Sequence, residues 1–209
     1  MKKGATSFKD TIFGILSRQE LLKLEIQGNK KGLEFISSLS DTAIRRDIDI
    51  QLILELHKIS YAWIFPKWAG KFRTINVTFS GKEALEHYKV REAIMNLCLD
   101  LKTRINYLPK EGDDNYITEI IKLLAWFQHA FVQIHPFNDY NGRTARMLTT
   151  FLLLKFNLHP IEIKADNKQD RNIYINALQT ADNGDYSQLE KLIEIALIES
   201  LSKSKPKIL

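Results

Sequence analysis

The stretch from His135 to Arg146 constrains this chain more than any other part of its sequence. It reads HPFNDYNGRTAR and continues directly into an apolar run, MLTTFLLL, at residues 147–154. An apolar run of this length after an amide-rich turn predicts a buried helix, with Asn141 and Gly142 at its N-terminal end. Free backbone N–H groups and the helix dipole at that end favour a bound anion.

Charged and titratable side chains flank this predicted helix start. Arg143 and Arg146 are three positions apart, so both project from one face of the helix. Cations at a helix N-terminus are unfavourable unless an anion uses them, so the pair predicts a ligand with more than one phosphate. Asp139 suits a bridging Mg²⁺, and His135 suits proton abstraction near neutral pH. The combination predicts transfer of a group from a nucleotide.

Each of these residues also has a structural interpretation when it is taken alone. A histidine before a proline is common in loops, and Asn-Gly is a common turn. By residue type, His129, His135 and Asp139 could also bind zinc. That alternative is disfavoured, because zinc would occupy the base and leave both arginines without a ligand. We expect the other histidines to be structural.

Apolar residues recur at helical spacing along most of the chain. This periodicity predicts helices over 83–106, 115–134, 143–156, 167–180 and 186–200. Another amphipathic helix is predicted after Ser40 and Asp41 from the spacing of Ile44, Ile48, Leu52, Leu56 and Ile59. Over residues 72–79 β-branched and aromatic side chains alternate, which predicts a short exposed hairpin. The predicted fold class is an all-α domain with one β-hairpin.

Composition and charge limit the remaining alternatives. With 209 residues and 44% apolar content, the chain can bury a substantial core as one domain. Its single cysteine, Cys98, precludes an intrachain disulfide and suits a reducing compartment. Neither a signal peptide nor a membrane-spanning run is recognisable, so a cytoplasmic protein without membrane partners is predicted. The net charge of +5 comes from scattered lysines rather than a basic stripe with aromatics, so nucleic-acid binding is not expected.

The motif at residues 135–146 resembles the signature of the Fic family (Fic/Doc, or Fido, domains), written HPFx(D/E)GNGRxxR. It matches every specified position except the glycine before Asn141, where this chain has Tyr140. A tyrosine there must point its ring away from the phosphates or lay it across the entrance to the site. It could therefore narrow the site, add a stacking surface or weaken activity.

The resemblance extends over about residues 45–195. Residues 70–78 look like the hairpin, called the flap, that Fic proteins place over a target peptide. Residues 127–134 resemble the helix that enters the motif, and 170–185 resemble the helix and turn that close the nucleotide pocket. Residues 1–44 then form an N-terminal helical segment, and residues 196–209 form a basic C-terminal tail.

The resemblance implies a protein adenylyltransferase that uses ATP and Mg²⁺. Such an enzyme moves AMP to a Ser, Thr or Tyr hydroxyl of a target protein and releases pyrophosphate. By this precedent His135 is the base, Asp139 holds Mg²⁺, and Arg146 takes the γ-phosphate. The implied nucleotide-binding residues are Asn138, Tyr140, Asn141, Gly142, Arg143, Arg146, Tyr174 and Asp182. The implied target-binding flap residues are Phe72, Arg73, Thr74, Ile75, Asn76 and Val77.

Many Fic proteins carry an inhibitory helix with the pattern (S/T)xxxE(G/N), whose glutamate pairs with the second motif arginine. The nearest match here is residues 23–29, where Gln27 replaces the glutamate and Lys23 replaces the serine or threonine. A neutral amide cannot form a bidentate ion pair with Arg146. The chain then resembles a form that is not self-inhibited, or one inhibited by a separate antitoxin-like partner. A homodimer is the alternative partner to such an inhibitor. The alternative is that residues 21–35 form an ordinary packing helix.

Other activities on the same fold are a Doc-like kinase, a de-AMPylating enzyme, or an ATP- or peptide-binding module that Tyr140 has weakened. Arg146 argues against Doc-like chemistry, because that branch lacks the full second-arginine pattern. Gln27 argues against de-AMPylation, because members with that activity use a glutamate there.

Overall fold

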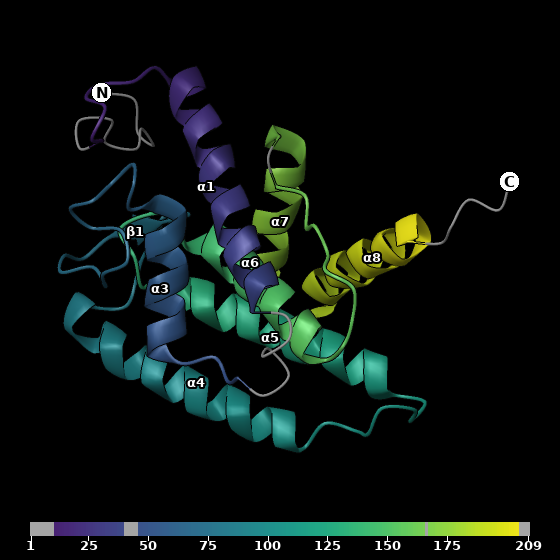
Figure 1. The fold of residues 1–209 in the computed structure, drawn as a ribbon. Coiled ribbons are helices and arrows are strands. Elements are labelled where there is room, and N and C mark those ends of the chain that lie inside the picture. Colours follow the sequence, from purple (N-terminus) through teal and green to yellow (C-terminus); the bar gives the residue numbers. More distant parts are fainter. Residues whose placement is uncertain (1–10, 40–45, 166, 205–209) are drawn as a thin grey trace, which may run out of the picture.

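The computed structural model describes residues 11–39, 46–165 and 167–204 of the chain. Within these residues it contains seven α-helices and one two-stranded antiparallel hairpin (Figure 1), which confirms the predicted fold class. The helices are α1 (Arg18–Ser38), α3 (Ile50–Tyr61), α4 (Val90–Asn106), α5 (Tyr116–Ile134), α6 (Asn141–Lys155), α7 (Lys168–Ala181) and α8 (Ser187–Ser204). A short 3-10 helix, His87–Lys89, leads into α4.

Helix α6 lies at the centre of the domain (Figure 1), packed against α1, α3 and α5. Its apolar run makes it buried on nearly every side: Thr144, Ala145 and the seven residues 147–153 are all buried. A helix that is apolar all round belongs inside a core. The predicted buried helix after the motif is therefore confirmed, and the core positions the start of α6.

Helix α1 is a close-packed part of this core. It begins with a capping box in which the Ser17 hydroxyl accepts from the Glu20 amide while the Glu20 carboxylate accepts from the Ser17 amide. Gly28 and Gly32 face α3 and α6: a Cβ on Gly28 would lie 2.6 Å from the Ser60 carbonyl oxygen, and one on Gly32 would lie 2.5 Å from the Met147 Sδ. Only glycine permits so close an approach of the helices.

Helix α3 begins later than its apolar spacing predicts. Asp49 is its N-cap, and the Asp49 carboxylate accepts a hydrogen bond from the Leu52 amide at 2.7 Å. Ile48 is buried without being helical. The predicted start near Ile44 lies outside the described residues, but the helix prediction for residues 46–49 is wrong. Apolar spacing records burial, whereas the capping carboxylate sets where the helix starts.

The hairpin consists of β1 (Thr78–Phe79) and β2 (Lys82–Glu83), with Thr78 opposite Glu83 and Phe79 opposite Lys82. Ser80 and Gly81 form its turn, and both have positive φ angles, 49° and 81°. Two consecutive positive φ angles are typical of the type I′ turn, which matches strand twist. The hairpin prediction is confirmed, but its placement at residues 72–79 is wrong, because most of that segment is an irregular approach to β1.

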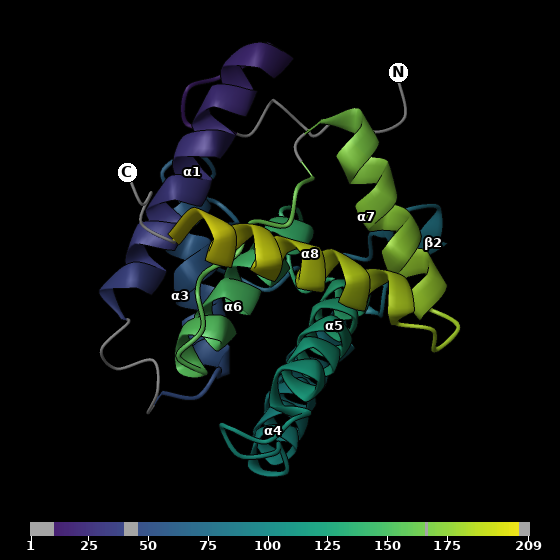
Figure 2. The same cartoon turned by 90° about the vertical axis from the view of Figure 1, so that its right-hand side faces the viewer.

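The last two helices pack against each other, and α8 crosses α5 (Figure 2). Helix α8 continues to Ser204, so residues 196–204 of the segment predicted as a tail are helical. Among the described residues, no helix combines the length and apolar character needed to cross a membrane.

Candidate active site

His135 caps the C-terminal end of α5 in the left-handed conformation, with φ of 51°. Its Nδ1 lies 3.2 Å from the Val132 carbonyl oxygen. Because a carbonyl can only accept, Nδ1 carries the proton and Nε2 keeps its lone pair. The imidazole is therefore oriented as a base that accepts through Nε2.

The surroundings of His135 favour its neutral form. The Phe79 ring of the hairpin stacks on the imidazole at a centroid distance of 4.3 Å. Burial, together with the nearby positive charge of Arg73, lowers the pKa of His135 to about 4, although the hydrogen bond to Val132 opposes this shift. At neutral pH the ring can thus accept a proton without first losing one.

The loop between α5 and α6 is held by side chains that point inward. The Asn141 side chain accepts from the Phe137 amide at 2.8 Å and donates to the Phe137 carbonyl at 2.9 Å. Phe137 stacks on His57 with a centroid distance of 3.7 Å. The His57 Nδ1 accepts from the Gly70 amide at 2.9 Å, so its Nε2 donates to the Asp139 carbonyl at 3.2 Å. His57 is structural, as predicted, and it fixes the main chain at Asp139.

Tyr140 is the N-cap of α6 and has φ of 62°, the left-handed region that favours glycine. Its ring is 5% exposed and stacks on Tyr61 at 4.2 Å, with Trp68 at 6.0 Å. The ring therefore faces the core and does not cross the start of α6. Of the two orientations that the sequence allowed, the structure has the one that leaves the helix N-terminus open.

Glu25 of α1 is a site residue that the sequence interpretation missed. Its side chain is 2% exposed, and it accepts from Arg143 Nη2 at 2.8 Å, Arg18 Nη1 at 3.0 Å and the Tyr140 hydroxyl at 3.1 Å. Gln27, in contrast, lies on the exposed face of α1. The carboxylate that pairs with a motif arginine is thus that of Glu25, two residues before Gln27. It pairs with Arg143 and not with Arg146. The helical spacing of Leu21, Glu25, Gly28 and Gly32 on one buried face was the signal available in the sequence.

The N-terminus of α6 faces α7. A Cβ on Gly142 would lie 3.7 Å from Arg146 Nη1 and 3.8 Å from Tyr174 Cε1, so these three residues share one side of the site. The Arg146 guanidinium lies over the Tyr174 ring at 5.1 Å. The Tyr174 hydroxyl is buried and has no hydrogen-bond partner within the described chain. A buried hydroxyl without a partner, beside Arg146 and a helix N-terminus, fits a polar, anionic ligand.

Asp139 and Asn138 lie in the loop just before this helix start. The Asp139 Oδ1 atom accepts from the Tyr140 amide at 2.7 Å, and Asn138 is exposed. Among the described residues, no group of three or more His, Cys, Asp and Glu side chains is placed to hold a metal ion. The zinc alternative therefore lacks a ligand set. A single carboxylate fits Mg²⁺, which takes one or two carboxylates together with substrate phosphates and water.

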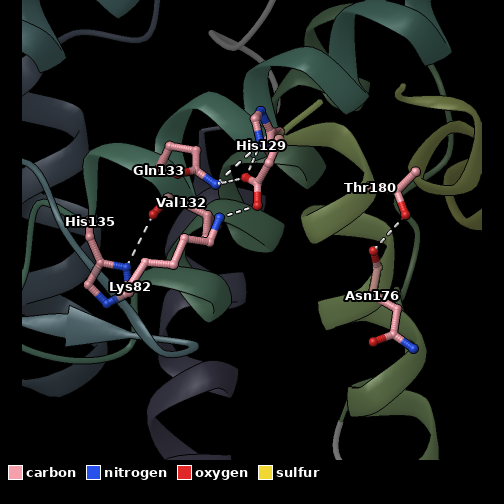
Figure 3. Close-up of polar contacts among 8 residues, drawn as sticks. Lys82, His129, Val132, Gln133, His135, Asn176 and Thr180 are labelled. Carbon is pink, nitrogen blue, oxygen red and sulfur yellow. Dashed lines mark hydrogen bonds and ion pairs between the residues drawn. The ribbon is translucent and has the colours of Figure 1, made fainter. Parts of the chain in front are cut away.

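Asp182 lies at the end of α7 and is tied to the hairpin. Its carboxylate accepts from Lys82 of β2, from Gln133 and, at 3.0 Å, from His129 Nε2. Figure 3 shows Lys82, Gln133 and His129 converging, with His135 nearby at the end of α5. Partial burial raises the pKa of Asp182, but the Lys82 and His129 hydrogen bonds outweigh it and lower the pKa. These contacts link the hairpin to the predicted nucleotide side of the site.

The predicted flap residues divide into two groups. Thr74, Ile75 and Asn76 are exposed, so they can meet a target, whereas Phe72 and Val77 are half-buried. Arg73 is 2% exposed and lies beneath the segment. Its side chain is held inside the fold, and target binding by Arg73 stays a prediction.

Comparisons with known proteins agree with this geometry. Residues 47–153, about half of the chain, match the model of the Fic/DOC family. A protein adenylyltransferase Fic of Nematostella vectensis is 31% identical over 163 residues, which cover 77% of this chain and 35% of that protein. The chain thus spans about a third of the length of this curated relative.

Two solved structures show the same fold. Fic-1 (residues 134–508) from C. elegans superposes with a TM-score of 0.70 at 25% identity, covering 90% of this chain and 52% of that one. The BepC protein of Bartonella tribocorum, a VirB-translocated effector with bound AMPPNP, has a TM-score of 0.63 at 18% identity, with 94% of each chain covered. The motif, the site geometry and the family match together show that this chain belongs to the Fic/DOC family.

Proposed function

We propose that this chain is a protein adenylyltransferase that moves AMP from ATP to a Ser, Thr or Tyr hydroxyl of a target protein. The observation that carries the proposal is the placement of His135, whose bare Nε2 lies at the end of α5, one loop before the open N-terminus of α6. The name of the Nematostella relative and the AMPPNP bound to BepC support the same activity.

The reaction can be assigned to atoms of this chain. The target hydroxyl gives its proton to His135 Nε2 while its oxygen attacks the α-phosphorus of ATP. The bond from that phosphorus to the oxygen bridging the α- and β-phosphates breaks, and pyrophosphate leaves. Because the pKa of His135 is lowered, the ring is neutral and can accept the proton.

The remaining residues bind charge rather than react. The free amides at the start of α6 and the Arg146 guanidinium stabilise the phosphate oxygens, where negative charge grows in the transition state. Asp139 would hold Mg²⁺, which supplies charge neutralisation at the phosphates. Tyr174, with its unpartnered hydroxyl, would close the nucleotide side of the site.

We also propose that α1 restrains this site through Glu25. Its carboxylate occupies Arg143, so a phosphate that needs Arg143 must compete with a buried ion pair. Inhibition by an antitoxin-like partner and a regulatory role of Gln27 are the alternatives, and a homodimer is a separate partner proposal. The exposure of Gln27 favours Glu25 over it.

Labelled ATP tests the proposed activity against its alternatives. The chain is incubated with Mg²⁺ and with ATP labelled at the α-phosphate in one sample and at the γ-phosphate in another, in the presence of cell lysate. Adenylyl transfer puts the α-label on protein and leaves the γ-label in pyrophosphate. The γ-label on protein would instead support a Doc-like kinase, and neither label would support a binding module.

De-AMPylation is tested with the same reagents. Protein carrying the α-labelled AMP is purified away from ATP and incubated again with fresh chain. A stable label supports transfer as the main activity, whereas release of labelled AMP would support the reverse chemistry. The His135→Ala variant serves as the control in both experiments, because it lacks the proposed base.

A further inference from the structure

The guanidinium of Arg73 is buried beneath the segment that leads to the hairpin. Within the described chain, all of its side-chain hydrogen bonds end on main-chain carbonyls. Nε donates to His135 at 2.7 Å, Nη1 donates to Ile75 at 2.9 Å, and Nη2 donates to Leu85 and, at 3.4 Å, to Ile134. One side chain thus joins three separate parts of the chain.

Two of these carbonyls lie at the C-terminal end of α5. The last carbonyls of a helix have no partner inside the helix, and the helix dipole makes that end negative. A buried cation is stable there only because these carbonyls replace its lost hydration. The Arg73 amide adds a further tie, since it donates to the Pro136 carbonyl at 3.0 Å. Arg73 therefore hydrogen-bonds the main chain before, at and after His135, at residues 134, 135 and 136.

We propose that Arg73 is a positioning residue, which holds His135 in its left-handed conformation and joins the approach to the hairpin to the catalytic loop. The inference rests on the proposed role of His135 as the base. Without these hydrogen bonds, His135 is free to leave its φ of 51°, a backbone conformation that is sterically unfavourable for a non-glycine residue. The imidazole would then turn away from the Val132 carbonyl and from the start of α6.

The planar fork of arginine is needed for this task. Arg73 uses three different nitrogen atoms to reach carbonyls that lie in different directions. A lysine keeps the charge but concentrates its donors on one atom, so it cannot serve all of these carbonyls at once. Arg73→Lys is therefore a sharper test than removal of the charge.

The experiment compares Arg73→Lys with Arg91→Lys, the same replacement at an exposed arginine of α4. Automodification is followed with α-labelled ATP over a range of ATP concentrations, well below the melting temperature of every variant. We expect Arg73→Lys to lower the maximal rate by about 10- to 100-fold, while the ATP concentration for half-maximal rate changes by less than about twofold. Arg91→Lys should match the wild type in both quantities.

A second readout does not depend on activity. In nitrogen-15 NMR spectra the His135 ring of the wild type should carry its proton on Nδ1, and Arg73→Lys should give a mixture of both tautomers. A wild-type chain without transfer but with this tautomer change would overturn the proposed function and leave the positioning role standing. An unchanged His135 signal in Arg73→Lys, or an unchanged maximal rate in a transferring chain, would overturn the positioning role itself.

Discussion

Glu25 lies 2.8 Å from Nη2 of Arg143, and this ion pair joins the first described helix to the first arginine of the motif. The Glu25 carboxylate is 2% exposed and the Arg143 side chain is 20% exposed, so solvent screens the pair only weakly. The Arg143 guanidinium is therefore already paired with a carboxylate of α1 when no nucleotide is bound. The proposed restraint on nucleotide binding follows directly from this ion pair.

Glu25→Gln should free Arg143 and raise the apparent affinity for ATP, because a neutral amide competes less well than a carboxylate with phosphate. It should also lower the free energy of unfolding by roughly 2–3 kcal/mol, since three donors lose a charged acceptor. ATP titrations and chemical unfolding measure the two effects. Glu34→Gln, an exposed glutamate on the same helix, is the control. Unchanged ATP affinity in Glu25→Gln would rule out the restraint.

Tyr140 can be tested in two steps. Tyr140→Phe removes only the hydrogen bond to Glu25, and we expect a loss of about 1–2 kcal/mol in unfolding free energy with transfer retained. Tyr140→Gly also removes a buried ring, so the loss should reach roughly 3 kcal/mol or more, even though glycine relieves the strained φ. Because the ring faces the core, neither change should increase the transfer rate. A clear increase with glycine would mean that the ring obstructs the site in solution.

His135→Ala should abolish transfer and leave ATP binding intact, because the proposed base acts on the hydroxyl and not on the nucleotide. Transfer is measured with α-labelled ATP, and binding by calorimetry at the same Mg²⁺ concentration. His159→Ala, at an exposed position outside the motif, provides the matched control. Wild-type transfer by His135→Ala would refute the mechanism.

Asp139→Ala should remove the dependence of ATP affinity on Mg²⁺, because its carboxylate is the proposed protein ligand of the ion. The affinity is measured by titration with and without Mg²⁺ in both proteins. Asn138→Ala alters the exposed neighbour while keeping the carboxylate, and we expect it to retain the Mg²⁺ effect. If Mg²⁺ strengthened binding equally in Asp139→Ala and the wild type, another group would have to hold the ion.

His57 should make the fold sensitive to acid. Burial lowers its pKa to about 3, although the hydrogen bond to the Asp139 carbonyl opposes the shift, so between pH 6.5 and 3 the unfolded chain binds a proton that the folded chain excludes. Its contribution to stability is complete above pH 6.5 and declines as the pH falls towards 3, by up to about 1.4 kcal/mol per pH unit. The lowered pKa of His135 acts in the same direction.

The measurement is the free energy of unfolding between pH 7 and pH 5 for the wild type and for His57→Gln. A glutamine can still donate to the Asp139 carbonyl and accept from the Gly70 amide, but it does not titrate. The variant should therefore show a shallower decline as the pH falls. Equal slopes in the two proteins would show that His57 is not the group that takes up the proton.

Local signals were enough to predict the helices around the motif. The Asn167 cap of α7 and the long apolar run of α6 depend on neighbours in the sequence, and both elements lie within two residues of their predicted limits. The start of α3 and the position of the hairpin in the sequence were predicted wrongly. The hydrogen bond from the Leu52 amide to the Asp49 carboxylate sets the start of α3, and the positive φ angles of Ser80 and Gly81 set the turn of the hairpin. Apolar periodicity indicates neither feature.

Contacts between distant segments could not be predicted from a single sequence. The ion pair of Glu25 with Arg143 spans 118 positions, and the hydrogen bond of Arg73 to the His135 carbonyl spans 62. The family resemblance implied that Arg73 binds the target from the flap, and arginine is rarely buried unless it is paired. The partners of Arg73 are main-chain carbonyls that only the folded chain brings together. Neither composition nor residue spacing indicates which carbonyls these are.

The lack of side chains at Gly28 and Gly32 bears on how far the protein can be truncated. They bring α1 against Ser60 and Met147 so closely that a single added methyl group on either glycine would collide with its neighbour. The family model matches residues 47–153. A fragment limited to these residues would lack α1 and would expose the faces of α3 and α6 that α1 covers. We therefore expect a fragment of residues 47–153 to be less stable than a fragment that also includes α1.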